Sequence, residues 1–205
     1  MDFKEVVELR RSIRKFKSDI VPKEHIKEII RLGTLAPSAH NSQKWLFKAV
    51  YNHDLNVRIA KSVLAKIDAL VERYEIEASV KGWKYYSSFF SKAPVVIYAF
   101  YSHSKGFLEE YAEGKLAKEE LEYLRLVPGV QSVGAAIENI LLAAVSMGYG
   151  ACWMTAPIVA AGEIEQILDM DEGFKLAAVI PVGVPFEVPG PRPRKELNQV
   201  MEIIE

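Results

Sequence analysis

The most apolar stretch of the chain, from about Val130 to Met147, is the feature that most limits the possible folds. A helix this apolar has to be buried. Gly134, Ala143 and Ala144 are small enough to let another element approach it closely. We therefore expect this helix at the centre of the core or of a subunit interface.

Predicted helices and strands are mixed along the rest of the chain without a strict βαβ order. The patterns predict strands over residues 45–51, 95–101, 151–155 and 176–184. They predict helices before residue 10, from residue 22 to about 36, over 55–78 and around 164–168. The connections between these elements are unequal in length, whereas a doubly wound sheet needs regular crossover units. The sequence therefore favours an α+β sandwich.

The length and composition predict a single domain spanning residues 1–205. At 205 residues and 50% hydrophobic content, the chain can fill a sizeable core. Beyond Pro185, prolines 189, 191 and 193 follow in quick succession and disfavour a regular helix or strand. We expect residues 185–205 to form an extended C-terminal arm.

Charge and cysteine content narrow the functional class. The formal net charge of -1 and the sequence pI near 6.5 argue against a nucleic-acid partner, because duplex binding needs a strongly basic surface. The single Cys152 excludes an internal disulfide and a multi-cysteine metal site, which fits a reducing compartment. The N-terminus lacks a signal-peptide core, and Glu138, Asn139 and Ser146 interrupt the most apolar run. We expect a cytoplasmic protein that does not span a membrane.

Two clusters of basic residues stand near the two ends of the chain. Arg10-Arg11-Ser12-Ile13-Arg14 follows the first predicted helix, and Arg192-Pro193-Arg194-Lys195 lies in the arm. Each guanidinium offers donors in a planar fork that matches phosphate or carboxylate oxygens. The first cluster alone fits a solvated helix end equally well, since cations complement the dipole there. Both clusters together, in a nearly neutral chain, predict a site for one small anion.

Several common catalytic patterns are missing from the sequence. Gly148-Tyr149-Gly150 ends a predicted helix and lacks the third glycine of a dinucleotide fingerprint, and there is no Walker-type phosphate loop. The four histidines have no metal-ligand spacing, and no serine lies in a nucleophile elbow. A hydrolase or metalloenzyme is therefore disfavoured, and we name no metal site and no classical catalytic residue.

Three segments allow two interpretations each. The polar loop from Ser38 to Gln43 is either a simple connection or a ligand-binding loop at a strand edge. The aromatic residues between Trp83 and Phe90 either pack in the interior, the commoner case, or form a ligand-stacking wall. The charged segment 104–125 is either a solvated helix or a substrate lid.

The ordered motifs of the chain resemble the FMN-dependent nitroreductase family. The resemblance covers essentially the whole chain and is carried by residues 10–14, by Ala36-Pro37-Ser38-Ala39-His40-Asn41-Ser42-Gln43-Lys44-Trp45, by Gly148-Tyr149-Gly150-Ala151-Cys152-Trp153-Met154 and by Arg192-Pro193-Arg194. It implies a nitroreductase-like three-layer αβα sandwich, with a mixed central sheet flanked by helices, in an intertwined homodimer with FMN sites at the interface. Lys44 stands where the family usually has proline.

The resemblance also implies which residues would hold FMN. Arg10 and Ser12 would meet the phosphate and ribityl chain, with Arg11 nearby, and Arg14 would lie at the pyrimidine edge. Arg192 and Arg194 would close over the phosphate. The remaining positions are Pro37, Ser38, Ala39, Asn41 and Gln43 from the partner subunit, and Trp153, Met154, Thr155 and Ala156 along the central ring, where a backbone N–H can reach the reactive nitrogen. Lys66 matches, weakly, a position at which some relatives contact the flavin.

The function implied by the resemblance is that of an NAD(P)H-dependent FMN oxidoreductase. Such an enzyme would transfer reducing equivalents from NADH or NADPH to a small acceptor, such as a nitroaromatic or a quinone, by a ping-pong mechanism. Relatives with this fold also dehalogenate iodotyrosine or fragment reduced flavin, and both activities stay open as alternatives. A non-catalytic FMN-binding module is the alternative of a different class.

Overall fold

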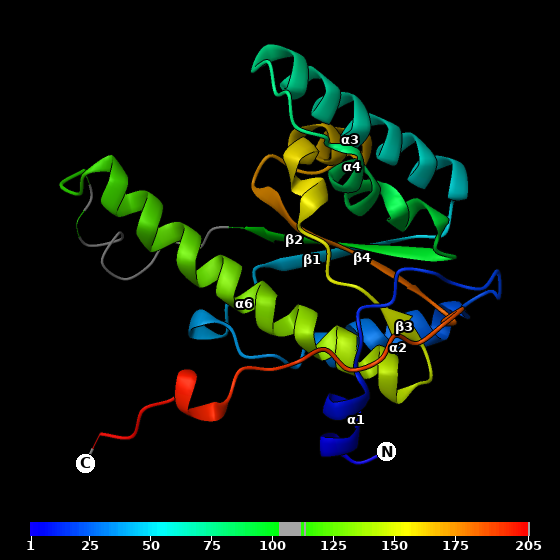
Figure 1. The fold of residues 1–205 in the computed structure, drawn as a ribbon. Helices are drawn as coiled ribbons and strands as arrows, with labels where there is room; N and C mark the ends of the chain where they lie inside the picture. Colours follow the sequence, from blue (N-terminus) through cyan, green and yellow to red (C-terminus); the bar gives the residue numbers. More distant parts are fainter. Residues whose placement is uncertain (103–111, 113, 205) are drawn as a thin grey trace.

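The computed structural model describes residues 1–102, 112 and 114–204 (Figure 1). Much of the predicted lid, up to residue 111 and at 113, lies outside the described residues. The elements are α1 (Phe3–Leu9), α2 (Lys23–Gly33), η1 (Ala39–Asn41), β1 (Trp45–Val50), α3 (His53–Arg73), α4 (Lys81–Ser88), η2 (Phe89–Lys92), β2 (Val95–Ser102), α6 (Lys118–Ser146), β3 (Gly150–Ala151), η3 (Ala156–Ala160), α7 (Ala161–Ile167), β4 (Phe174–Gly183) and η4 (Leu197–Gln199).

The four strands form one sheet in the order β1-β2-β4-β3, and neighbouring strands run antiparallel. β2 and β4 form the centre and are rich in β-branched and aromatic residues, which suit a buried pleated surface. The sheet is therefore antiparallel rather than mixed, and the parallel pairing recorded among the described residues is an isolated bridge between Ser12 and Ala151, where the N-terminal segment joins β3. The predicted α+β class is confirmed.

The sheet lies between two layers of helices, which confirms the predicted αβα sandwich (Figure 1). Alternate side chains of β2 point to opposite faces, so Tyr98 and Phe100 pack with α3 and α7, whereas Ile97 and Ala99 pack with α2 and α6. The register between β2 and β4 shifts at Ala99 and leaves Ala177 as the extra residue of a bulge.

The long helix α6 occupies the core position that its composition predicts, but it begins at Lys118 rather than near Val130. Pro128 lies inside the helix, where a proline removes one backbone hydrogen bond without ending this helix. Residues 128–146 are long and apolar enough to cross a membrane by length and composition alone. Ile137 and Ile140 are fully buried in the layer with α2 and the sheet, and 39% of this apolar window is buried within the chain.

Three other element boundaries differ from the sequence prediction. α2 ends at Gly33 rather than near residue 36, and residues 34–36 form a turn. α3 ends at Arg73 rather than near residue 78, because Glu75 adopts a left-handed backbone with φ of 50°. The predicted strand over 151–155 is reduced to Gly150–Ala151, and only Met154 rejoins the sheet, through a bridge to Val179.

Gly150 lies where the N-terminal segment, β3 and the arm meet. A Cβ atom at this position would lie 2.5 Å from Ile13 Cγ1 and 2.9 Å from Pro185 Cγ. Both distances are shorter than non-bonded carbons tolerate, so a side chain here has to displace the segments that carry the two basic clusters.

We predict that Gly150→Ala lowers the free energy of unfolding by about 1–3 kcal/mol, because it overpacks a buried contact. Gly162→Ala in α7 is the matched control, since nothing lies within 4 Å of its added Cβ. The control should be neutral or stabilising by up to about 1 kcal/mol. Urea unfolding curves measure both changes, and equal stability of the two variants would contradict the packing described here.

Candidate anion-binding site

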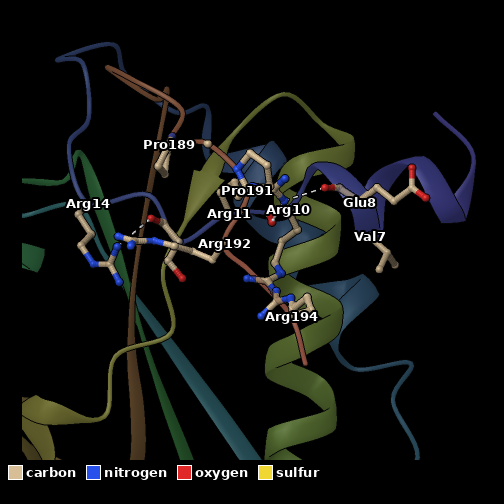
Figure 2. Close-up of a pocket in the computed structure, with 11 residues that line it drawn as sticks. Val7, Glu8, Arg10, Arg11, Arg14, Pro189, Pro191, Arg192 and Arg194 are labelled. Atoms are coloured by element: carbon tan, nitrogen blue, oxygen red, sulfur yellow. Dashed lines mark hydrogen bonds between the residues drawn. The ribbon is translucent and has the colours of Figure 1, made fainter. Parts of the chain in front are cut away.

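The two basic clusters line one cleft, although they are almost 180 positions apart in a chain of 205 residues. The cleft has a volume of about 670 Å³ and lies between the end of α1 and the arm (Figure 2). Its five arginines and one glutamate give the lining a net charge of +4, against -1 for the whole chain. The lining residues are Val7, Glu8, Arg10, Arg11, Ser12, Arg14, Pro189, Gly190, Pro191, Arg192 and Arg194.

The first cluster is positioned by the end of α1. The Asp2 side chain accepts a hydrogen bond from the Glu5 N–H at 2.9 Å and fixes the start of this short helix. At its other end, Arg11 Nη1 donates to the carbonyl oxygens of Glu8 at 2.7 Å and Arg10 at 2.8 Å. Arg11 thus caps free carbonyls at the negative end of the helix and also adds charge to the cleft wall.

Backbone hydrogen bonds hold the second cluster beside the first. The N–H of Phe186 donates to the Lys15 carbonyl at 3.0 Å, and the N–H of Lys17 donates to the Val184 carbonyl at 2.9 Å. Lys15 and Glu187 add an ion pair at 2.9 Å, and the carboxylate raises the pKa of Lys15. The arm therefore leaves β4 alongside residues 15–17, and this course carries Arg192 and Arg194 back to the cleft.

Two arginines of the cleft contact residues that the sequence analysis did not connect to them. Arg10 Nε lies 3.7 Å from the Glu138 carboxylate on α6. The Arg14 guanidinium lies over the ring of Tyr86, 5.6 Å from its centroid, and its Nη1 donates to the Ser12 carbonyl at 3.4 Å. Long-range contacts of this kind leave no local pattern in the sequence.

The stretch after β3 lies next to the first cluster, because the Ile13 N–H donates to the Ala151 carbonyl at 2.9 Å. Cys152 follows and is buried. Burial raises the pKa of its thiol, while Arg14, the Ser12 hydroxyl and Arg10 act in the opposite direction. A thiol with a raised pKa stays protonated near neutral pH and is a poor nucleophile.

The predicted ring-binding stretch 153–156 is anchored through Met154. The Met154 side chain is buried, and its N–H and carbonyl pair with Val179 at 3.0 Å. Within the described part of the chain, no hydrogen bond is recorded from the N–H groups of Trp153, Thr155 and Ala156. These three N–H groups, and not that of Met154, are therefore the ones available to a ligand, although none of the four residues lines the cleft.

The polar loop 38–43 lies away from the cleft of its own chain, since none of its residues is in the lining. His40, Asn41 and Gln43 adopt left-handed backbone angles, with φ of 54°, 52° and 48°. The Gln43 N–H donates to the Ser38 hydroxyl at 3.0 Å and holds this conformation. A cluster of such conformations costs free energy and is typical of binding segments. A contribution of Pro37, Ser38, Ala39, Asn41 and Gln43 to a partner's site stays a prediction.

The aromatic residues at 83–90 do not all have the same environment: some pack in the interior, and others lie at a surface hollow. Phe89 and Phe90 are buried in the core with α3. Tyr85 and Tyr86 are exposed and line a smaller hollow of about 160 Å³ that shares Ser12 and Arg14 with the main cleft. Helical spacing predicts which residues share a face, but it does not identify the neighbour of that face.

Several residues of the site were missed in the sequence. Val7, Glu8 and the Pro189-Gly190-Pro191 run line the cleft, and their only signal is that they adjoin the two basic clusters. Lys66 Nζ instead forms an ion pair with Glu163 at 2.8 Å. Among the described residues, no group of three or more His, Cys, Asp or Glu side chains could hold a metal ion.

The fold and the cleft together define a class of protein. This is a three-layer α+β domain with a dense arginine cleft at one edge of its sheet. The model of the nitroreductase family matches residues 7–184, and the chain belongs to that family. It is thereby an oxidoreductase of a flavin-dependent family, which confirms the resemblance seen in the sequence.

Similar proteins agree with this assignment. A Methanothermobacter thermautotrophicus protein, provisionally named NADH dehydrogenase/NAD(P)H nitroreductase, is 31% identical over 94% of this chain and 82% of its own length. Human iodotyrosine deiodinase 1 is 27% identical over 98% of this chain and 68% of its own. The crystal structure of a BluB-like flavoprotein from Clostridium difficile 630 superposes with a TM-score of 0.90, at 32% identity and full coverage of both chains.

We predict that Lys66→Gln leaves anion binding in the cleft unchanged, because Lys66 is paired with Glu163 and lies outside the lining. The ion pair is partly exposed, so the free energy of unfolding should fall by less than about 1 kcal/mol. The Lys66 hydrogen bond lowers the pKa of Glu163. A lowered folded-state pKa stabilises the protein above the ordinary carboxyl pKa, and this stabilisation is lost as pH falls through the folded-state value.

The measurement for Lys66 is urea unfolding of both proteins between pH 3 and 7, together with titration by inorganic phosphate. The stability difference should shrink toward the acid end of this range. A loss of phosphate affinity in Lys66→Gln would place this residue in the site after all.

Proposed function

We propose that the protein binds FMN and transfers reducing equivalents from NADH or NADPH to a small acceptor, such as a nitroaromatic or a quinone. One observation carries the proposal: arginines from both ends of the chain converge with Ser12 in a single cleft. A phosphate dianion matches this donor set, because each guanidinium can donate two parallel hydrogen bonds to its oxygens. A volume of about 670 Å³ lies within the range of sites for cofactor-sized ligands.

The residues present fit an FMN phosphate at one end of the cleft. Arg10, Arg192 and Arg194 would hold the phosphate from two sides, and Arg11 would add charge from its place at the end of α1. Ser12 is small enough to approach the ligand closely and adjoins Ala151 through the parallel bridge. Arg14 stands beyond Ser12, so it would meet the ring end of the ligand rather than the phosphate.

When bound, FMN would supply the hydride and electron chemistry that side chains lack. The cleft itself offers binding groups, since five of its lining residues are arginines and the Cys152 thiol beside it stays protonated. The N–H groups of Trp153, Thr155 and Ala156 could donate to a ring held along them. No acid or base from this chain is required, which fits alternating use of one open face by donor and acceptor.

The proposal includes a homodimer with the sites at its interface and a cytoplasmic location. A dimer is supported by the exposed apolar residues of α1 and of the arm, among them Phe3, Leu9, Ile203 and Ile204, which are 51–88% exposed in the single chain. In such a dimer, the loop 38–43 of the partner subunit would contribute to the flavin site. The single cysteine supports the location.

Two related reactions are the second candidates, favoured by particular relatives. Human iodotyrosine deiodinase 1 matches 98% of this chain, and the BluB-like flavoprotein has a TM-score of 0.90. Reductive dehalogenation or fragmentation of reduced flavin would use the same cleft. A flavin-binding module without catalysis would keep the cleft and lack reduction by NADH or NADPH.

The proposal predicts that the purified protein carries FMN or takes it up on titration. Under nitrogen, NADH or NADPH should bleach the flavin absorption, and a nitroaromatic or quinone should restore it. Adding iodotyrosine in place of that acceptor separates the deiodinase candidate, because only a deiodinase would release iodide. A protein that binds no FMN would refute the proposal, and one whose bound FMN is never reduced by either nucleotide would be a binding module.

We further predict that Arg10→Ala and Arg194→Ala each weaken FMN binding about tenfold to a hundredfold, as expected for loss of a charge-assisted hydrogen bond worth about 1.5–3 kcal/mol. The double variant should deviate from additivity by more than about 0.5 kcal/mol, because both groups contact the same phosphate. Fluorescence titration with FMN measures these changes.

Riboflavin and Arg31→Ala are the controls for this prediction. Riboflavin has no phosphate, so its affinity should hardly respond to either substitution. Arg31 is exposed on α2 and paired with Glu28. Arg31→Ala therefore changes the net charge by the same amount as Arg10→Ala or Arg194→Ala, but it leaves the cleft intact. If Arg10→Ala and Arg194→Ala weakened FMN and riboflavin binding equally, the clusters would act only as general surface charge. The same conclusion would follow if Arg31→Ala weakened FMN binding as much as they do.

A further inference from the structure

Arg14 lies at the junction of two hollows. It lines the main cleft of about 670 Å³ and also the neighbouring hollow of about 160 Å³, which Tyr85 and Tyr86 border. Of the three arginines in the first basic cluster, Arg14 is the one that also borders the second hollow, away from Arg10 and Arg194. The direction of this side chain decides whether its charge reaches the part of a ligand that lies beyond the phosphate.

Hydrogen bonds alone hold Arg14 weakly. Within the described part of the chain, its one recorded hydrogen bond is that to the Ser12 carbonyl, and 3.4 Å is at the long end for such a bond. Arg10 and Lys15 each have a carboxylate partner, Glu138 and Glu187, whereas no ion pair is recorded for Arg14 among the described residues. The guanidinium also lies over the face of the Tyr86 ring, and this cation–π contact helps to hold it in place.

Tyr86 is itself supported from the core. Its ring meets the edge of Tyr85, with centroids 5.2 Å apart and planes at 75°, and Tyr85 lies 5.9 Å from Phe89. Phe89 is buried, so a series of aromatic contacts leads from the interior to the surface ring under Arg14. These contacts support a large ring that is 53% exposed at the mouth of the site.

We propose that Tyr86 is a positioning residue that holds the Arg14 guanidinium toward the ring end of the bound flavin. The inference rests on the proposed function, and it adds a specificity role: Arg10 and Arg194 select for the phosphate, whereas Tyr86 acts through Arg14 on the ring system. The phenol hydroxyl has no part in this role, because the contact uses the ring face. Tyr86→Phe should therefore keep this positioning role, whereas Tyr86→Leu should lose it.

The test measures the affinities of FMN and riboflavin in Tyr86→Leu, Tyr86→Phe and Arg14→Gln. Tyr86→Leu should weaken both flavins about two- to fivefold, the range of an exposed cation–π contact, and Tyr86→Phe should bind as the wild type does. Arg14→Gln should also weaken both flavins. In the Arg14→Gln background, Tyr86→Leu should have no further effect, because the ring then has no cation to hold.

Trp83→Leu is the matched control, since Trp83 lies on the same helix, is 38% exposed and lines neither hollow. It should bind both flavins like the wild type. Wild-type affinity in Tyr86→Leu would overturn the inference, as would an undiminished effect of that substitution in the Arg14→Gln background, which would mean that the ring contacts the flavin directly. A wild-type protein that binds neither flavin would instead overturn the proposed function, and this inference with it.

Discussion

The candidate site depends on the backbone hydrogen bonds that attach residues 13–17 to the edge of the sheet. The Ile13 N–H is bonded to Ala151 of β3, and residues 15 and 17 are bonded to the chain just after β4. Without these bonds, the basic segment after α1 would be a free connection, and the arm would leave the sheet in no fixed direction. Glycine at positions 150 and 183 makes the approach possible, because a Cβ at either would lie within 3 Å of atoms of a neighbouring segment.

This arrangement creates an electrostatic cost that a ligand can offset. Five guanidinium groups share one cleft, and the single Glu8 of the lining and the Glu138 partner of Arg10 neutralise only part of their charge. Two like charges 4 Å apart repel by about 1 kcal/mol even in water, and by more where water is partly excluded. A dianion bound between them removes this repulsion, so binding and folding should be thermodynamically linked.

Sequence reasoning recovered the parts of the fold that local patterns encode. The strand at 95–101 follows from β-branched content and lies where predicted. The helix that was expected from residue 22 follows from helical spacing, but it ends at Gly33 rather than near residue 36. The start of α6 was wrong because Pro128 is compatible with a helix when the rest of the helix is well packed. The end of α3 was wrong because the left-handed Glu75 has no glycine to mark it.

The candidate site, like the fold, could be predicted from the sequence only in part. The arginines of the two clusters could be chosen from composition alone, since two dense groups of cations in a chain of net charge -1 need an explanation. Their meeting in one cleft depends on the sheet register and on the course of the arm, which local patterns do not encode. Glu138 on α6 and Tyr86 on α4 are far from Arg10 and Arg14 in the sequence, and no local pattern pairs them, so only the tertiary structure relates them to these arginines.

The composition of the cleft also limits the chemistry that this chain can perform alone. Its lining contains arginines, one serine, one glutamate and apolar residues, and the nearby thiol is kept protonated by burial. Arginine does not exchange its proton near neutral pH, so the five guanidinium groups bind and orient a ligand but do not relay protons. Under the proposed function, selectivity among acceptors would come from groups around the ring end of the flavin, where Arg14 lines both the cleft and the neighbouring hollow. Whatever holds Arg14 in place would then bear on which acceptors are reduced.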